Sequence, residues 1–157
     1  MKWLLQRDYE QPATYHLYDG GYRIAWLAYN TNAHSIRLTY AEQRRTFFLR
    51  SGGFFSGKIA LLNEYGQAVG KGSFPDRKDE GVIQVEAVRL HYSFDETLPA
   101  VLLRDDTSKR LVKVCRLAFV RSMNVEEQMG LLLSLAWLFG ESAAFSGPRQ
   151  TPALANY

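Results

Sequence analysis

The chain has 157 residues, of which 46% are hydrophobic and 22% are charged, and its formal net charge is +3 at pH 7. This length suits one domain, and the composition excludes a wholly disordered chain, a collagen and a coiled coil. The single cysteine, Cys115, cannot form a disulfide within the chain, which favours a reducing compartment. The apolar run at residues 3–5 is too short for a signal peptide, and the run at 128–140 is shorter than the roughly 20 residues of a transmembrane helix. We therefore expect a soluble, cytoplasmic protein.

Up to about residue 120, short runs of aromatic and β-branched residues alternate with turn signals. Spacings of about 8–12 residues between such runs predict antiparallel hairpins, and no alternation with helical segments indicates βαβ units. Turn signals lie at residues 19–21, 65–67 and 105–108, where Gly, Asn or Asp residues cluster. The predicted strands cover residues 2–6, 14–18, 22–29, 35–40, 45–50, 58–63, 68–74, 82–87, 89–94, 100–104 and 111–120.

A different pattern begins near residue 122 and predicts one helix. Asn124 and Glu127 fit a capping box at the start of this helix. Between residues 131 and 139 only Ser134 is polar, so the helix is apolar on every side and should be surrounded by protein. Gly140 is the predicted stop after the helix. We expect one barrel domain over residues 1–145 with the buried helix near 125–139, followed by a flexible tail, rich in Pro and small residues, at 146–157.

One apolar helix after some eleven strands suggests that the sheet closes around the helix. Closure would also remove the exposed edge strands of so long a meander. The residues therefore predict a mainly β fold, a closed antiparallel barrel wrapped around a hydrophobic C-terminal helix.

Residues 45–70 combine an aromatic strand at 45–50, a glycine-flanked turn, and the pattern L-x-(D/N)-x-x-G-x-x-V-G at 61–70. This segment resembles the central hairpin of the Tubby-like barrel superfamily, which includes the LURP-one-related proteins and the phospholipid scramblases. The resemblance implies about twelve antiparallel strands around the helix, and binding of phosphoinositides through basic residues on the barrel surface. No single ligand residue of that family can be carried over. The cysteine cluster and calcium segment of the scramblases have no counterpart here.

Basic residues are concentrated in the first half of the fold, because residues 21–75 hold seven of them against two acidic ones. Such a segment suits an anionic partner, although solvated strand faces would show the same pattern. Along the predicted strand 45–50 and the residue before it, side chains alternate between two faces. Arg44 and Arg50 share one face, and Arg45 lies on the other. We expect an anionic ligand at five residues, with Arg44, Arg50, Lys58 and Lys71 forming one outer patch: Arg44, Arg45, Arg50, Lys58 and Lys71.

Motifs for catalysis and metal binding are incomplete. Residues 52–59 approach a P-loop but lack Ser or Thr after Lys58, and residues 140–144 approach a nucleophile elbow but follow a helix. The three histidines, at positions 16, 34 and 91, show no metal-ligand spacing, and Cys115 has no cysteine partner. We therefore expect no enzyme activity, no metal and no cofactor.

The expected function is that of a non-enzymatic binding protein that takes an anionic phospholipid or phosphoinositide headgroup, peripherally at a membrane. The alternative is a structural or protein-interaction module with no small-molecule ligand. A nucleic-acid partner is not expected, because no RNP-like strand is present and a net charge of +3 is small against several phosphate contacts. A hollow barrel for an apolar ligand is disfavoured, because the helix would fill it.

Overall fold

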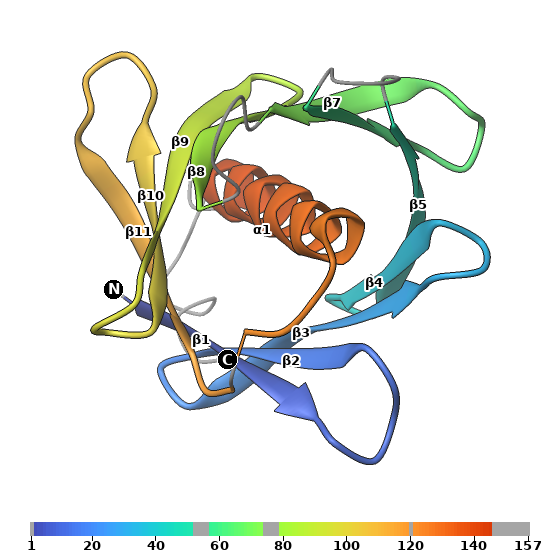
Figure 1. The fold of residues 1–157 in the computed structure, drawn as a ribbon, viewed down its shortest axis with the longest axis horizontal. Coiled ribbons are helices and arrows are strands. Elements are labelled where there is room, and N and C mark those ends of the chain that lie inside the picture. The colour runs from blue at the N-terminus through green and yellow to red at the C-terminus, as the bar shows by residue number, and fades with distance from the viewer. Residues whose placement is uncertain (1, 52–56, 74–78, 120, 146–157) are drawn as a thin grey trace.

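Eleven strands of the described residues form a closed barrel around one helix (Figure 1). The structure is a computed structural model that describes residues 2–51, 57–73, 79–119 and 121–145. The strands are β1 (Lys2–Asp8), β2 (Thr14–Asp19), β3 (Tyr22–Asn30), β4 (Ser35–Tyr40), β5 (Gln43–Ser51), β6 (Lys58–Leu62), β7 (Ala68–Ser73), β8 (Glu80–Val85), β9 (Val88–Asp95), β10 (Ala100–Asp105) and β11 (Leu111–Leu117), and the helix is α1 (Val125–Phe145).

The barrel is a meander whose last strand returns to its first. Each strand pairs antiparallel with the next, whereas β1 and β11 pair parallel, from Lys2 opposite Val114 to Leu5 opposite Leu117. With eleven strands running alternately up and down, the first and the last point the same way, so the closing pair must be parallel. The predicted closed barrel is confirmed. Among the described residues the barrel has eleven strands, and the closing pair of β1 and β11 is the one parallel pair in a sheet expected to be antiparallel throughout.

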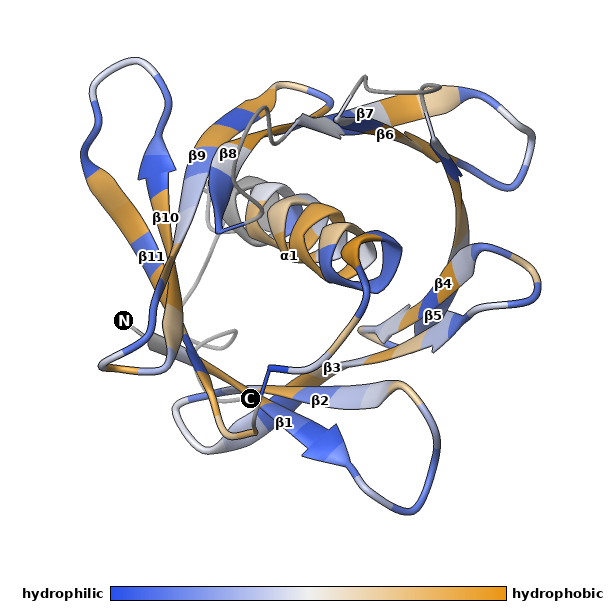
Figure 2. Cartoon of the chain, in the orientation of Figure 1, coloured by the Kyte–Doolittle hydropathy of each residue, from blue (hydrophilic) through white to orange (hydrophobic). Residues whose placement is uncertain are grey.

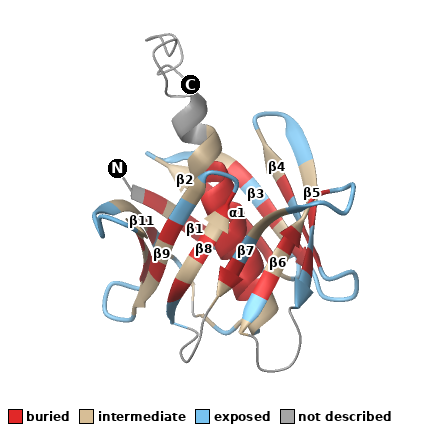
Figure 3. Ribbon diagram, turned by 90° about the horizontal axis from the view of Figure 1, so that it is seen from above, coloured by how far each residue is buried: buried red, intermediate tan, exposed pale blue. Residues whose placement is uncertain are grey.

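The apolar side chains of the strands face inward and form the core with α1. Along β5, Phe47 and Leu49 are buried while Phe48 and Arg50 are exposed, which is the alternation of a sheet with one face covered. Figure 2 shows the apolar colour of α1 inside the ring of strands, and Figure 3 shows its buried turns within the barrel. Because the strands surround α1 with apolar side chains, a helix that is apolar on every side is buried on every side.

The helix lies off the barrel axis, and it packs most closely against β8. Gly72 on β7 makes room for it, because a Cβ at this position would lie 2.7 Å from Met129 Cε. Gly72, two residues beyond the hairpin motif at 61–70, therefore has a packing reason.

The N-cap of α1 is as predicted, but the Glu127 side chain bonds to β2 instead of completing the predicted capping box, and the helix ends later than predicted. The backbone N–H of Glu127 donates to Asn124 Oδ1 at 2.7 Å, which confirms Asn124 as the N-cap. The Glu127 carboxylate accepts a hydrogen bond from the Tyr15 hydroxyl on β2. Gly140 does not end the helix, which continues to Phe145. Glycine serves close packing there, because a Cβ at 140 would lie 2.9 Å from Val88 Cγ2. The tail at 146–157 lies outside the described residues.

Candidate functional site

A row of long polar side chains crosses the outer face of the barrel from β5 to β9. The strand register places Arg50 beside Ala60, Ala60 beside Lys71, Lys71 beside Gln84, and Gln84 beside Arg89. Neighbouring strands are about 4.8 Å apart. Arg50 and Lys71 are separated by one strand, so their Cα atoms are about 10 Å apart. The small Ala60 between them leaves the space above the sheet open.

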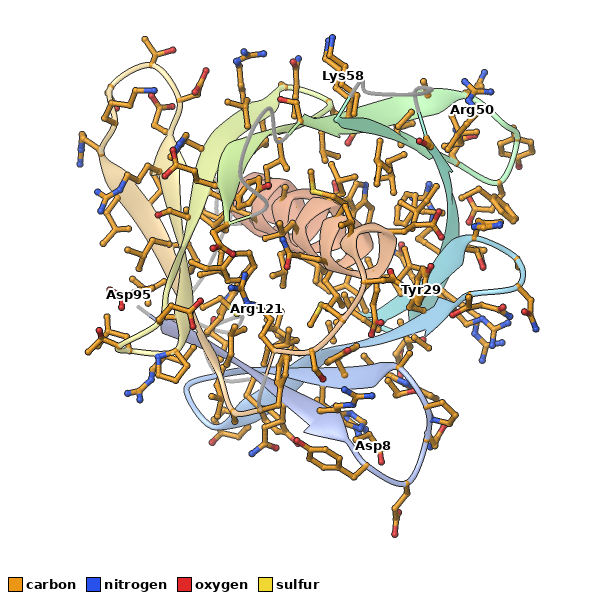
Figure 4. All side chains as sticks on the ribbon, in the orientation of Figure 1. Asp8, Tyr29, Arg50, Lys58, Asp95 and Arg121 are labelled. Atoms are coloured by element: carbon orange, nitrogen blue, oxygen red, sulfur yellow. The ribbon has the colours of Figure 1, made fainter. Side chains whose placement is uncertain are left out.

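Lys58 lies diagonally beside this row and completes a hollow. It pairs in register with Ser73 on β7, which neighbours Val82 on β8. The hollow has a volume of about 200 Å³. We call it the basic hollow, and its lining residues are Lys58, Lys71, Gly72, Ser73, Val82, Gln84 and Arg89. Figure 4 shows the labelled side chains of Arg50 and Lys58 pointing outward from this side of the barrel.

The charges in the basic hollow, and that of Arg50 beside it on β5, are not equally compensated. Arg89 donates from Nε to Asp106 Oδ2 at 2.7 Å and from Nη1 to Gln84 Oε1 at 3.1 Å, so its guanidinium is held in place. The Arg89 hydrogen bond lowers the pKa of Asp106 and keeps that carboxylate charged. Arg50 and Lys71 form no ion pair with any residue that the structure describes. The excess positive charge therefore lies toward the β5–β7 side.

The structure brings together three of the five residues expected to bind an anion, namely Arg50, Lys58 and Lys71. Arg44 lies six residues before Arg50 on β5, about 20 Å away, and is outside the hollow. Arg45 faces the barrel interior, where its guanidinium lies over the rings of Phe47 and Trp137 at 5.3 and 5.4 Å and pairs with Glu64 at 3.3 Å.

Arg89 is the residue of this site that reasoning from the sequence missed. Its place depends on the register of the β8–β9 hairpin, in which Val85 pairs with Val88 across a two-residue turn. The predicted strand at 82–87 includes both residues of this turn, 86 and 87, so the predicted strands do not define that register. The register follows once residues 86 and 87 are assigned to a two-residue hairpin turn.

Apolar side chains accompany the cations on the same outer face. Phe48, two residues before Arg50 on β5, keeps 38% of its surface exposed. It pairs in register with the half-buried Leu62 on β6. The outer face beside the basic hollow therefore presents an exposed phenyl ring close to the exposed Arg50.

His16 and His34 each lie beside a carboxylate. His16 Nε2 lies 3.1 Å from Asp8 Oδ2, and His34 Nδ1 lies 2.9 Å from Glu126 Oε1. Burial raises the pKa of the Cys115 thiol to about 12, so it is a poor nucleophile at neutral pH. Within the described ranges, no group of three or more His, Cys, Asp or Glu side chains is placed to hold a metal ion. The backbone at 140–144 belongs to α1, which excludes the strand–turn–helix of a nucleophile elbow.

Comparisons with known proteins leave the fold and the site to be interpreted from the chain alone. No family model, no curated protein and no solved structure matches it. The Tubby-like resemblance therefore stays a prediction that rests on the hairpin motif at residues 45–70. No helix in the described part of the chain combines the length and the apolar character needed to cross a bilayer.

Proposed function

We propose that this barrel is a non-enzymatic protein that binds the phosphorylated headgroup of an anionic lipid, peripherally at a membrane surface. The observation that carries the proposal is the convergence of Arg50, Lys58 and Lys71 on the outer face of β5, β6 and β7. The Tubby-like resemblance supports the same ligand class, because that family binds phosphoinositides on its barrel surface.

The charge of the site suits a headgroup that carries more than one negative charge. Each basic residue near an anionic membrane contributes about 1 kcal/mol of attraction, so three of them contribute about 3 kcal/mol. This attraction is screened by salt, because the Debye length falls to about 8 Å at physiological ionic strength. We therefore expect moderate binding that weakens as salt is added.

Phe48 favours a lipid over a free phosphate as the source of the anion. A soluble phosphate would contact only the cations, whereas a membrane would also cover the exposed phenyl ring and Leu62 beside it. The hollow and the apolar residues lie on adjoining strands of one outer face, so a single approach to the membrane would engage both.

Liposome co-sedimentation tests the proposal. The protein is mixed with vesicles of neutral lipid, of neutral lipid with phosphatidylserine, and of neutral lipid with a phosphoinositide, at about 50 and about 150 mM salt. We expect sedimentation with the anionic vesicles alone and a smaller bound fraction at the higher salt. The variant Arg50→Glu should lower the bound fraction several-fold, and Arg50→Glu with Lys71→Glu should abolish binding.

Arg116→Glu is the matched control, because Arg116 is also exposed on the outside of a strand, β11, but lies away from the hollow. It makes the same change of charge and should leave sedimentation nearly unchanged. Equal losses in the Arg50 and Arg116 variants, or no sedimentation of the native chain at either salt, would overturn the proposal. Binding of a soluble inositol phosphate without vesicle binding would assign the hollow to a free phosphate instead.

A further inference from the structure

A second surface, on the outer face of β2, β3, β4 and the start of β5, combines an exposed indole with basic side chains. Trp26 on β3 keeps 36% of its surface exposed, although the other two tryptophans are buried in the core. The ring of His16 on β2 stacks beside it, with centroids 6.4 Å apart and an interplanar angle of 27°. The two rings form an aromatic platform on the outside of the barrel wall.

The His16 ring is held in this position from both sides. Its Nε2 lies 3.1 Å from Asp8 Oδ2, and its Nδ1 lies 3.4 Å from Nη1 of Arg23. The platform is therefore preorganised, because a hydrogen bond at each ring nitrogen fixes the plane of the imidazole. Arg23 also brings a guanidinium to the edge of the platform.

Two further arginines flank Trp26 on the other side. Trp26 pairs in register with Thr39 on β4, and Arg37 lies two residues from Thr39 on the same strand face. Thr39 in turn pairs with Arg44 on β5. Arg37 is therefore a diagonal neighbour of both Trp26 and Arg44. Diagonal neighbours in a sheet are roughly 7–8 Å apart, within reach of long side chains. Neither Arg37 nor Arg44 forms an ion pair with a described residue.

We propose that this surface, formed by His16, Arg23, Trp26, Arg37 and Arg44, binds single-stranded nucleic acid. A base stacked on Trp26 would place its backbone phosphates between the guanidinium groups on either side. Stacking on aromatic side chains combined with a basic track along the backbone is the general way in which proteins hold single strands. A polymer also suits a convex surface without a deep pocket, because its affinity is the result of several separate contacts along the chain.

This surface is separate from the basic hollow. Arg44 and Arg50 lie at opposite ends of β5, and the stacking platform is on β2 and β3 whereas the hollow is on β6 to β9. The expectation that nucleic acid is not a partner rested on the whole-chain charge of +3 and on the absence of an RNP-like strand. The structure gathers three arginines and two rings from four strands, which neither of those measures detects.

Fluorescence anisotropy of a labelled oligothymidylate of about 15 nucleotides tests the proposal with the full chain. We expect binding at about 50 mM salt, and an apparent Kd about twentyfold higher at about 200 mM, which is the value for three phosphate contacts on a single strand. Trp26→Ala should raise the Kd at least about fivefold, and Trp26→Tyr should restore most of the affinity. Tyr22→Ala, which removes an exposed aromatic from the same strand, is the matched control and should bind like the native chain.

Intrinsic fluorescence supplies a second readout at the same residue. Because Trp3 and Trp137 are only 1% and 6% exposed, quenching by unlabelled oligonucleotide would come from Trp26. Arg37→Glu and Arg44→Glu should each weaken binding, whereas Arg50→Glu should not. Absence of binding at the lower salt, full affinity in Trp26→Ala, or equal losses in Arg44→Glu and Arg50→Glu would each overturn the inference. Vesicle binding by the basic hollow is measured separately, so either proposal can fail without the other.

Discussion

The hydroxyl of Tyr29, on β3, donates a hydrogen bond of 2.5 Å to Glu126 Oε1 in the first turn of α1. Together with the Tyr15 hydroxyl, which donates to Glu127, it joins the wall of the barrel to the N-terminus of the buried helix. Both contacts place a carboxylate at the positive end of the helix dipole and a neutral phenol against it. The seating of the helix therefore depends on phenols that keep their protons.

This dependence predicts a loss of stability in alkali. Burial first, and then the hydrogen bond to Glu126, raise the pKa of Tyr29 to about 12. The unfolded chain loses this proton near pH 10, so between about pH 10 and 12 the folded state binds more protons than the unfolded one. The free energy of unfolding should therefore fall as pH rises through this window, and it should be unaffected by this group below it.

Thermal unfolding followed by circular dichroism between pH 8 and pH 12 measures the effect. This range covers the pKa of Tyr29 in the unfolded chain, near 10, and in the folded chain, about 12. Tyr29→Phe should show a shallower decline of Tm above about pH 10 than the native chain, because it removes one of the groups that titrate. Tyr65→Phe is the control, since Tyr65 is exposed in a turn. An identical decline in the native chain and in Tyr29→Phe would contradict the prediction.

A glycine between β7 and β9 should tolerate no side chain. A Cβ at Gly81 would overlap the backbone carbonyl of Ser73, which cannot move without shifting β7. We expect Gly81→Ala to lower the free energy of unfolding by about 1–3 kcal/mol, the range for overpacking, as measured by urea unfolding.

Gly72→Ala is the matched control for this effect. Its Cβ would meet side-chain atoms and no backbone: Met129 Cε at 2.7 Å, Met129 Sδ at 3.3 Å and Ile83 Cγ2 at 3.3 Å. The end of the Met129 side chain can rotate away, so the cost should be about 1 kcal/mol or less. An equal loss in both variants would show that the distinction between backbone and side-chain neighbours is wrong here.

The turn between β4 and β5 offers a stabilising change. Ala41 and Glu42 both have positive φ, at 49° and 63°, in a two-residue hairpin turn whose preferred residues are Asn and Gly. Non-glycine residues pay roughly 1–2 kcal/mol in this region, so Ala41→Asn with Glu42→Gly should raise the free energy of unfolding by about 1 kcal/mol. The control Glu42→Ala removes the charge but not the strain. It should give no such gain in urea unfolding, and a gain equal to that of the double variant would contradict the argument.

The existence of most elements could be predicted from local sequence. The strands follow from alternation and turn residues, and the buried helix follows from its apolar surface, because each pattern depends on residues close together in the chain. Asn124 is a local signal of the same kind, since its side chain caps a backbone N–H three residues away. The end of α1 could not be predicted in this way, because the role of Gly140 is set by Val88 on a distant hairpin.

The sequence by itself determined that the chain forms a strand meander with an apolar helix, and that Arg45 lies on the opposite face of its strand from Arg44 and Arg50. Only the tertiary structure decided which face is the inside, so that Arg45 lies against Trp137 while Arg50 reaches solvent. It also decided the register that aligns Arg50, Lys71 and Arg89 in one row, and that places Arg44 with Trp26 on another surface. Register and closure depend on pairing between strands, and a slip of one residue would turn each of these side chains to the other face.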